Sequence, residues 1–324
     1  MDIDNPFASE TEGRRFSQFV DELSARGRRP ATIRAYTSDW IDLSCWFRRV
    51  EKASFEAGLL NAAHIRAWRD GALKKGRSGA TAARRLAFAR TYAQWLAAEG
   101  WLAREVCDDM KTIEALPTTH RSPKLLSPPE VRALCLQVDA HGCLRDQAVI
   151  YTLLGTGMKV GELVSMTVGQ LDLPARRIVI PGRRCVIPIS DRVAWRLGWS
   201  LMERGFPGHV LDPDLPSPPA SRLMITSPMP LSAGPRDEHQ AVFVGERGPL
   251  TANAVQRVVR KHGQFARVDA SPQVLRHIFA VQYAVKFKDP VTLAELLGLE
   301  SLDAARVYLR LAEQYEGESW EEAA

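Results

Sequence analysis

A stretch rich in proline, threonine and serine, residues 112–128 (TIEALPTTHRSPKLLSP), divides this sequence into two parts with different patterns. Residues 1–111 show the three- and four-residue apolar spacing of helices, whereas residues 129–313 mix helical and strand-like patterns. A chain of 324 residues is long enough for two domains, each with its own core. We therefore predict two domains joined by a linker and followed by an acidic tail over residues 314–324.

The first part is predicted to consist of helices. Near its start, apolar residues recur at helical spacing: Phe16, Phe19, Val20 and Leu23. A second helix is expected after Pro30 with Thr32 as its N-cap, because a threonine hydroxyl can accept hydrogen bonds from the first N–H groups of a helix. A later helix should run from about residue 81 to 99, and Gly100 should end it.

Basic side chains gather around this later helix: Lys74, Lys75, Arg77, Arg84, Arg85 and Arg90. They could form an ordinary solvated face, or a DNA-binding surface that follows phosphates. The formal net charge of +5 and the pI near 9.0 favour a polyanionic partner, because neutralising phosphates releases counterions. Charge alone leaves both interpretations open.

The second part is predicted to be mainly helical with a small β-sheet, an α+β fold. Ser127 and Glu130 form a capping-box pattern that should start a helix. Two strand-like segments, residues 177–181 and 185–189, flank a short turn. Helices are expected at about residues 129–139, 144–155, 251–263, 273–287, 290–298 and 302–313, with a proline- and serine-rich surface insertion at about 207–240.

Several classes of protein are excluded. No apolar run approaches the roughly 20 residues that span a bilayer, and the acidic, polar start lacks the order of a secretion signal. The five cysteines are scattered, without the spacing of a metal site or of a disulfide framework: Cys45, Cys107, Cys135, Cys143 and Cys185. We expect a cytoplasmic protein with reduced thiols and no membrane partner.

Four short motifs follow one another in the second part: GMKVGEL at residues 157–163, QVLRH at 273–277, ELLGL at 295–299 and ARVYLR at 305–310. Together with the helical first part and the linker, they resemble the tyrosine recombinase family of phage integrases and Xer-type enzymes. The resemblance covers nearly the whole chain. It implies a helical, SAM-like core-binding domain, a catalytic-type domain of mixed structure, and a C-shaped clamp with DNA between them.

The resemblance also implies a mechanism. In this family a tyrosine attacks a DNA phosphate and forms a 3′-phosphotyrosine, while two arginines stabilise the transition state and a strand-turn lysine protonates the leaving oxygen. Because the bond energy is kept in the phosphotyrosine, no cofactor and no metal is implied. The implied partners are double-stranded DNA, further copies of the chain in a tetramer, and a second recombinase or accessory protein. The protein would act at the nucleoid.

Two of the six catalytic positions match the family: Tyr308 is the nucleophile and Arg276 the second arginine. Four positions depart from it: Lys159 for the first arginine, Arg183 for the strand-turn lysine, Gln273 for a histidine, and Leu299 for the histidine or tryptophan after Leu-Leu-Gly. A lysine keeps the charge but loses the bidentate grip on phosphate. An arginine is a poor proton donor, and a glutamine cannot transfer a proton.

Two functions therefore stay open, besides a DNA-free helical scaffold. The first is a site-specific recombinase or integrase that uses Tyr308. The second is a protein of this fold that has lost cleavage and serves as a DNA-binding partner or regulator of a recombination complex. His277 should point about 100° away from Arg276 on a helix, so we interpret it as a structural histidine. Glu162 should anchor its own helix turn or a neighbouring basic side chain.

Overall fold

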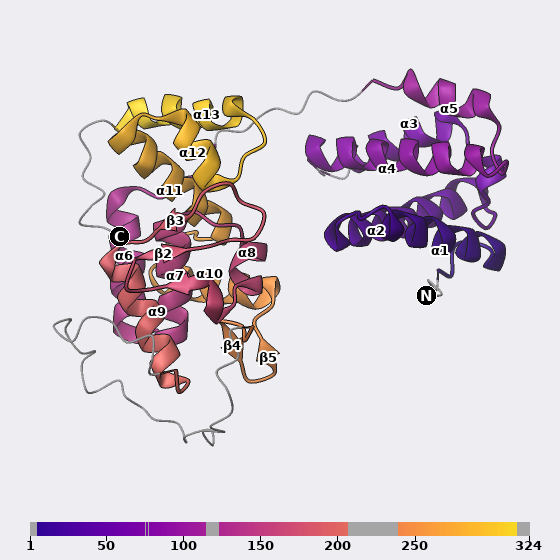
Figure 1. Ribbon diagram of the computed structural model, residues 1–324. Helices are drawn as coiled ribbons and strands as arrows, with labels where there is room; N and C mark the ends of the chain where they lie inside the picture. The colour runs from indigo at the N-terminus through magenta and orange to yellow at the C-terminus, as the bar shows by residue number, and fades with distance from the viewer. Residues whose placement is uncertain (1–4, 75, 77, 115–122, 207–238, 316–324) are drawn as a thin grey trace. The chain divides into compact units, whose positions relative to one another are not determined.

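The computed structural model describes residues 5–74, 76, 78–114, 123–206 and 239–315 (Figure 1). By its internal contacts the chain divides into two compact units, Met1–Arg121 and Ser122–Ala324. The predicted domain boundaries and the predicted C-shaped clamp stay predictions, and much of the predicted linker, insertion and acidic tail lies outside the described residues.

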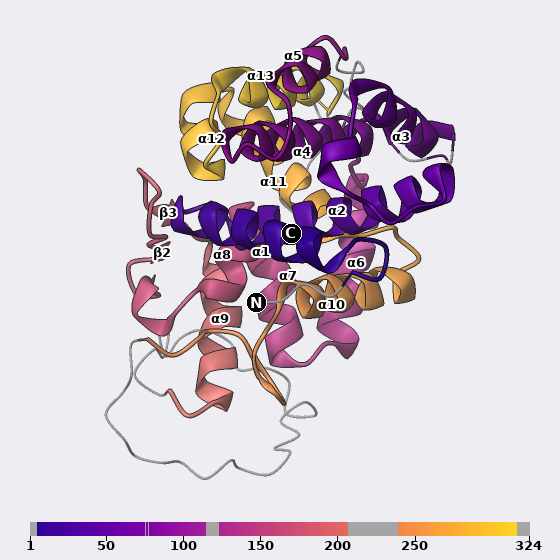
Figure 2. The same cartoon turned by 90° about the vertical axis from the view of Figure 1, so that its right-hand side faces the viewer.

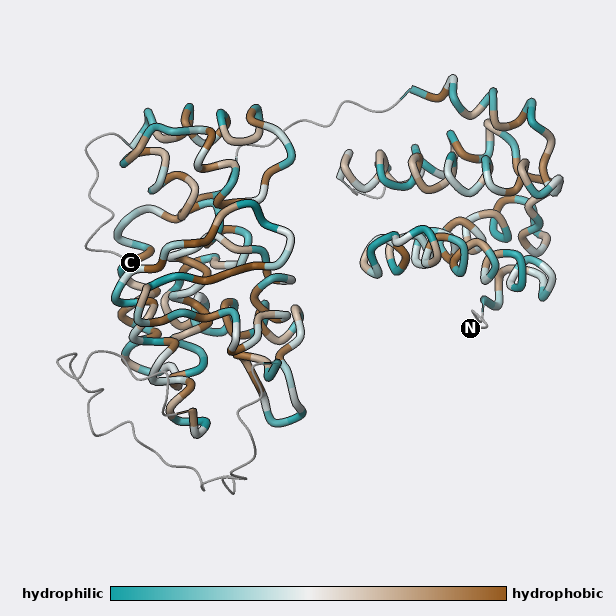
Figure 3. The backbone as a smooth tube through the Cα atoms, in the orientation of Figure 1, coloured by the Kyte–Doolittle hydropathy of each residue, from teal (hydrophilic) through white to brown (hydrophobic). Residues whose placement is uncertain are grey.

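The described part of the first unit consists of helices that pack around an aromatic core. The helices are α1 (Glu10–Ala25), α2 (Pro30–Glu51), α3 (Ala62–Lys74), α4 (Gly79–Ala98) and α5 (Arg104–Lys111). Brown and teal alternate along them in Figure 3, as amphipathic helices require. In the core, the rings of Phe16 and Trp40 stack with centroids 4.2 Å apart, and Tyr92 and Phe16 form a T-shaped pair.

Local capping signals explain where these helices begin. Ser78 starts α4 by accepting a hydrogen bond from the Thr81 N–H. In α2 the predicted N-cap Thr32 is wrong: the helix begins at Pro30, and Arg29 stands at the N-cap without a side-chain bond. The fixed φ of proline suits the first helical position, where its missing N–H is not needed.

The second unit is also mainly helical. Its helices are α6 (Pro128–His141), α7 (Leu144–Thr156), α8 (Val160–Ser165), α9 (Asp191–Glu203), α10 (Ala252–Phe265), α11 (Pro272–Phe287), α12 (Pro290–Leu297) and α13 (Leu302–Ala312). The predicted capping box at Ser127 is confirmed, since Glu130 accepts a hydrogen bond from the Ser127 N–H at 2.8 Å. The predicted mainly α fold with a small β-sheet is confirmed, whereas α9 was not anticipated from the sequence.

The sheet is smaller than expected. Strands β1 (Leu171–Asp172), β2 (Arg177–Ile178) and β3 (Ile187–Pro188) form an antiparallel sheet in the order β1-β2-β3, and β4 (Val244–Gly245) pairs with β5 (Gly248–Pro249). Ile178 lies opposite Ile187, so the predicted strand pair exists but each strand is two residues long. Pro181 and Pro188 cannot donate to a strand ladder, which limits the pairing.

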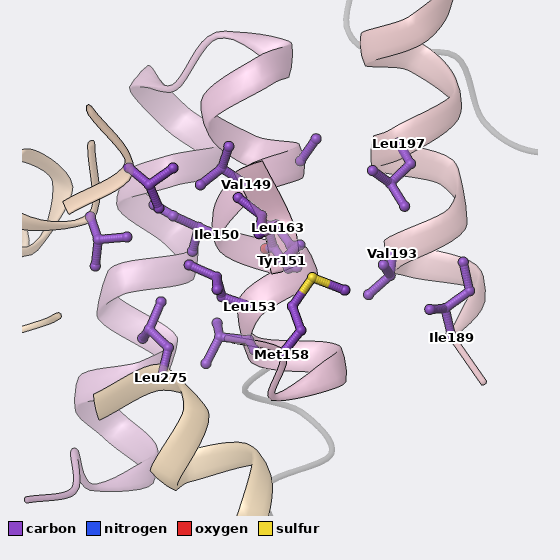
Figure 4. Packing of buried hydrophobic residues seen from close by; sticks show 14 of the residues in the cluster. Val149, Ile150, Tyr151, Leu153, Met158, Leu163, Ile189, Val193, Leu197 and Leu275 are labelled. Atoms are coloured by element: carbon purple, nitrogen blue, oxygen red, sulfur yellow. The ribbon is translucent and has the colours of Figure 1, made fainter. Parts of the chain in front are cut away.

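Helix α7 lies in the centre of the second unit's core (Figure 4). Val149, Ile150 and Leu153 are fully buried, and Val193 and Leu197 of α9 pack on the same cluster. Because α7 is buried on several sides, its C-terminal end is held in place, and the candidate site begins at that end.

Among the described residues, every helix is too short or too polar to span a bilayer.

Helices α11, α12 and α13 pack against one another at one end of the unit, as Figure 1 and Figure 2 both show. Ser301 caps α13 by accepting from the Ala304 N–H, and the helix buries Ala305, Tyr308 and Ala312. These three positions recur at helical spacing, so the tyrosine is held on the face that meets α11 and α12.

All five cysteines, each in a described segment, carry free thiols.

Candidate active site

A pocket of about 590 Å³ in the second unit collects side chains from four places in the sequence. It is lined by the turn between α7 and α8 and by helices α10, α11 and α13. Its polar side chains are Lys159, Gln256, Arg260, Ser271, Gln273, Arg276, His277 and Tyr308. None of the described residues that line the pocket is a carboxylate, so three cationic side chains make it a site for an anion.

Arg276, which lines this pocket, forms hydrogen bonds with the ends of two helices. Its guanidinium donates to the carbonyl oxygen of Gly157 at 2.5 Å and to that of Leu297 at 2.6 Å. These are the ends of α7 and α12, whose last carbonyls lack partners within the helix. Burial lowers the pKa of Arg276 from its ordinary value, but an arginine stays charged in proteins. The pocket therefore holds a permanent positive charge in a fixed place.

Tyr308 presents its hydroxyl beside His277. The Nδ1 atom of His277 lies 2.8 Å from the Tyr308 oxygen, within hydrogen-bond distance. Burial raises the pKa of Tyr308, although the charge of Arg276 acts in the opposite direction. Burial and the same arginine lower the pKa of His277 below its usual 6.5. A neutral phenol and a neutral imidazole therefore face each other at neutral pH.

His277 lines the pocket despite its 100° step from Arg276, and its interpretation as a structural histidine stays a prediction. Arg276 and His277 both line the pocket, although they are neighbours on α11. The pocket spans a wide arc of the helix: Arg276 reaches toward Gly157, and His277 reaches toward Tyr308. A step of 100° along a helix separates two side chains but does not exclude both from a broad cavity.

The sharp turn after α7 places Lys159 at the pocket. Gly157 adopts a left-handed φ of 58°, and an added Cβ would lie 2.4 Å from Phe279 Cδ1. The chain then reverses, and α8 starts with the Lys159 N–H bound to Glu162 at 2.6 Å. The exposed Lys159 ammonium donates to the carbonyl of Gly298 at 3.2 Å.

Arg183 does not line the pocket. Its side chain is 4% exposed and forms a two-pronged ion pair with Glu162, with Nε and Nη2 donating at 3.0 and 2.5 Å. A third bond goes to the carbonyl oxygen of Leu296. Burial opposes the charge on Glu162, but the bonds from Arg183 and from the Lys159 N–H outweigh it and lower the pKa of Glu162. The prediction that Glu162 anchors its turn and a neighbouring basic side chain is confirmed.

Gln273 and Leu299 lie where a proton-transferring or polar side chain was expected from the resemblance. Gln273 is exposed in the first turn of α11 and lines the pocket, so its amide can donate a hydrogen bond there. Leu299 is partly buried and packs on the cluster formed by α11, α12 and α13. It therefore contributes packing and no polar contact.

Arg260 and Gln256 were missed by the sequence reasoning, although both line the pocket. They are four residues apart on α10 and therefore share one face of that helix. The sequence therefore shows that Gln256 and Arg260 share a polar face of α10. It does not show that this face lies next to α11, because tertiary packing and not helical spacing determines which helices are neighbours.

The basic residues predicted in the first unit differ in exposure. Lys74 is exposed at the end of α3, while Lys75 and Arg77 lie outside the described residues. Arg84 is partly exposed and pairs with Asp39. Because burial raises the pKa of Asp39 to about 6 against the pull of the arginines, Arg84 also compensates a buried carboxyl group.

Arg85 and Arg90 are engaged within the first unit. The buried Arg85 pairs with Asp42 at 2.8 Å and lies over the ring of Trp68. Arg90 donates to backbone carbonyls at and after the end of α5. Their guanidinium groups therefore stabilise the helical core. DNA contact by the basic set stays a prediction, for which Lys74 and Arg84 are the exposed candidates among the described residues.

Comparison with known sequences finds relatives along both units. Residues 16–100 match the model of the phage integrase N-terminal SAM-like domain. The XerC tyrosine recombinase of Corynebacterium efficiens is 26% identical over 298 residues, which cover 89% of this chain and 83% of the relative. Tyrosine recombinase XerC 1 of Ralstonia nicotianae is 29% identical over 294 residues, or 84% of this chain and 82% of the relative.

Comparison with solved structures finds the same fold. XerH site-specific recombinase, in a post-cleavage complex with a palindromic difH substrate, aligns with a TM-score of 0.64 and 16% identity, over 96% of this chain and 89% of that chain. A lambda integrase dimer bound to a COC′ core site aligns with a TM-score of 0.64 and 14% identity, over 90% and 93%. The likeness extends through both units.

Proposed function

Because this chain belongs to the tyrosine recombinase family, we propose that it breaks and rejoins DNA at specific sites through a 3′-phosphotyrosine formed at Tyr308. The observation that carries this proposal is the pocket that Tyr308 lines together with Lys159, Arg260 and Arg276. A nucleophile surrounded by cations suits an anionic electrophile such as a DNA phosphate. XerH, whose fold this chain shares, was solved bound to a palindromic difH substrate, and lambda integrase was solved bound to a COC′ core site.

In this proposal the Tyr308 oxygen attacks the phosphorus, and negative charge grows on the non-bridging oxygens. Arg276 is held by two backbone carbonyls, so it can stabilise this charge without reorganising. Lys159 adds a second positive charge, and the Gln273 amide donates a hydrogen bond. The bond energy remains in the phosphotyrosine, and the free 5′ hydroxyl later reverses the step.

We assign Arg183 a supporting role. Its guanidinium is engaged by Glu162 and by the Leu296 carbonyl. It therefore fixes the turn between β2 and β3 onto the end of α12, beside the pocket rather than within it. The lysine of the pocket is Lys159, which makes Lys159 the candidate acid for the leaving oxygen.

The proposed partners are double-stranded DNA and further copies of this chain. Lambda integrase was solved as a dimer bound to a COC′ core site. Each strand that is cut through a phosphotyrosine needs its own nucleophile, so rejoining two duplexes needs several copies of the chain. Lys74 and Arg84 of the first unit are the proposed phosphate contacts of that unit, and the two units would clamp one duplex. A second recombinase or accessory protein completes the proposal, and all of these would meet at the nucleoid in the cytoplasm.

A second candidate is a DNA-binding member of the family that no longer cuts. Gln273 and Leu299 favour it, because neither side chain can transfer a proton, and so does the engagement of Arg183 outside the pocket. Under this alternative, Tyr308 is only a buried tyrosine. Specific DNA binding would then persist without any covalent product.

A trapping experiment separates the two candidates. The protein's binding site is selected from a random DNA library, and nicked suicide duplexes that carry this site are incubated with the protein. Covalent adducts are detected on denaturing gels. We expect an adduct from the wild type and none from Tyr308→Phe, because the phenol oxygen is the nucleophile.

The matched control is Tyr315→Phe, a second tyrosine a few residues after α13, and it should form adducts at the wild-type rate. An adduct that persists in Tyr308→Phe would reject the assignment of the nucleophile. Tight, specific binding without an adduct from any variant would favour the second candidate.

A further inference from the structure

His277 is the titratable side chain that contacts the Tyr308 hydroxyl, and the family resemblance gives it no role. We propose that Nδ1 of His277 is the general base that takes the proton of Tyr308 when it attacks DNA. This proposal rests on the recombinase function proposed above. It starts from the 2.8 Å separation between the imidazole nitrogen and the phenol oxygen. This separation falls within the roughly 2.6–3.2 Å between heavy atoms at which a general base can remove a proton.

The surroundings of His277 favour an imidazole that can accept a proton. The other charged or titratable side chains that line its pocket are Arg276 from its own helix, Lys159 from the turn after α7, Arg260 from α10 and Tyr308 from α13. None of the described lining residues carries a carboxylate that would stabilise imidazolium in the resting state. Burial and Arg276 lower the pKa of the ring, so it is neutral at neutral pH.

Tyr308 needs such a base. Its phenol is buried, and burial raises its pKa above the ordinary value, so the nucleophilic phenolate is rare at neutral pH. Gln273 occupies the position where the family has a histidine, and an amide cannot accept the proton. A histidine four residues later on the same helix face restores a proton acceptor to the pocket.

The proposed step balances in atoms and charge. The Tyr308 O–H bond breaks as the O–P bond forms, and the proton moves to Nδ1 of His277, which becomes imidazolium. The P–O5′ bond breaks, and the leaving oxygen takes a proton from the Lys159 ammonium. When the 5′ hydroxyl attacks the phosphotyrosine, both proton transfers run backwards. The approach of an anionic phosphate to the three cations offsets the extra charge on the imidazole.

The test is His277→Asn in the full-length protein, with single-turnover adduct formation on nicked suicide DNA. Asparagine places a hydrogen-bonding atom near the position of Nδ1 but cannot take a proton. At pH 7 we expect the rate to fall by about a hundredfold or more, the usual contribution of general base catalysis. DNA affinity should be unchanged. His141→Asn, an exposed histidine at the end of α6, is the matched control and should keep the wild-type rate.

The pH profile distinguishes a base from a residue that only positions the tyrosine. The wild-type rate should be level from neutral to alkaline pH, since the imidazole is already neutral there. The His277→Asn rate should instead rise about tenfold per pH unit from pH 7 to 9, because the phenol must then ionise by itself.

An unchanged rate, or a slow rate with the wild-type profile, would overturn the role of His277 while leaving the recombinase function in place. No adduct from the wild type would overturn both proposals together.

Discussion

Asp146 carries a buried charge in the first turn of α7, at the end of that helix opposite to the pocket. Burial alone would raise its pKa, but hydrogen bonds from His262 and Arg145 outweigh this effect and lower the pKa from 3.8 to about 2. The carboxylate therefore stabilises the folded state above its unfolded pKa, and this contribution is lost as the pH falls toward about 2. One pKa unit corresponds to about 1.4 kcal/mol, so the lowered pKa of Asp146 contributes about 2 kcal/mol to the free energy of unfolding.

We predict that Asp146→Asn removes this acid sensitivity. Between pH 4 and pH 2, the unfolding free energy of the second unit should drop by about 2 kcal/mol more in the wild type than in the variant. Urea unfolding at each pH, followed by the methyl NMR signal of the buried Ile150, measures this unit alone. Asp303→Asn, on the exposed side of α13, is the control. A constant difference between wild type and Asp146→Asn down to pH 2 would contradict the prediction.

At the scale of elements, the sequence predicts what short-range chemistry determines. The capping box at Ser127 needs only Glu130 three residues later, so it could be recognised without a tertiary structure. The last four predicted helices correspond to α10 through α13 with small differences at their ends. Their starts follow from local caps, such as Ser271 before α11 and Asp289 before α12.

The sequence does not predict what long-range contacts determine. Whether Arg183 faces the pocket depends on Glu162 and Leu296, which are 21 and 113 residues away. The contact between His277 and Tyr308 spans 31 residues and two helices. Strands β2 and β3 are shorter than the apolar segments 177–181 and 185–189, because Pro181 and Pro188 cannot donate to the strand ladder. Four of the five predicted catalytic residues therefore lie in one pocket, while Arg183 does not.

The turn between α7 and α8 yields a prediction at this scale. An alanine at position 157 would be strained at a φ of 58°, and its Cβ would overlap Phe279 and Leu297, at 2.4 and 2.8 Å. Strain and overpacking together should destabilise the second unit by about 2–4 kcal/mol. Because Arg276 binds the Gly157 carbonyl, adduct formation should also slow by tenfold or more under folding conditions.

Gly182→Ala is the matched control for Gly157→Ala. Gly182 has a φ of 80°, but no heavy atom lies within 4 Å of an added Cβ. It should therefore show only the backbone strain, about 1 kcal/mol. Urea unfolding followed by the Ile150 methyl signal compares the two variants. Equal losses would show that the close approach of Phe279 is not the source of the effect.

At the scale of the whole molecule, the proposed clamp requires both units to bind the same duplex. Lys74 belongs to the first unit, and Arg260 lines the pocket of the second. Each phosphate contact that is lost reduces the slope of log K against log salt concentration by about 1. We predict a reduction of about 1 for Lys74→Gln and for Arg260→Gln, and of about 2 for the double variant, measured by fluorescence anisotropy.

The additivity of these slopes is what identifies a clamp. If one unit held the DNA alone, the variant in the other unit would leave the slope unchanged, and the double variant would match a single one. Lys111→Gln is the control for loss of a surface charge, because the Lys111 ammonium already pairs with Asp108 at 2.7 Å. Slopes that fall in Lys111→Gln as much as in Lys74→Gln would mean that net charge, and not a contact, governs binding. Two separate reductions with an unchanged control require phosphates bound by both units at once.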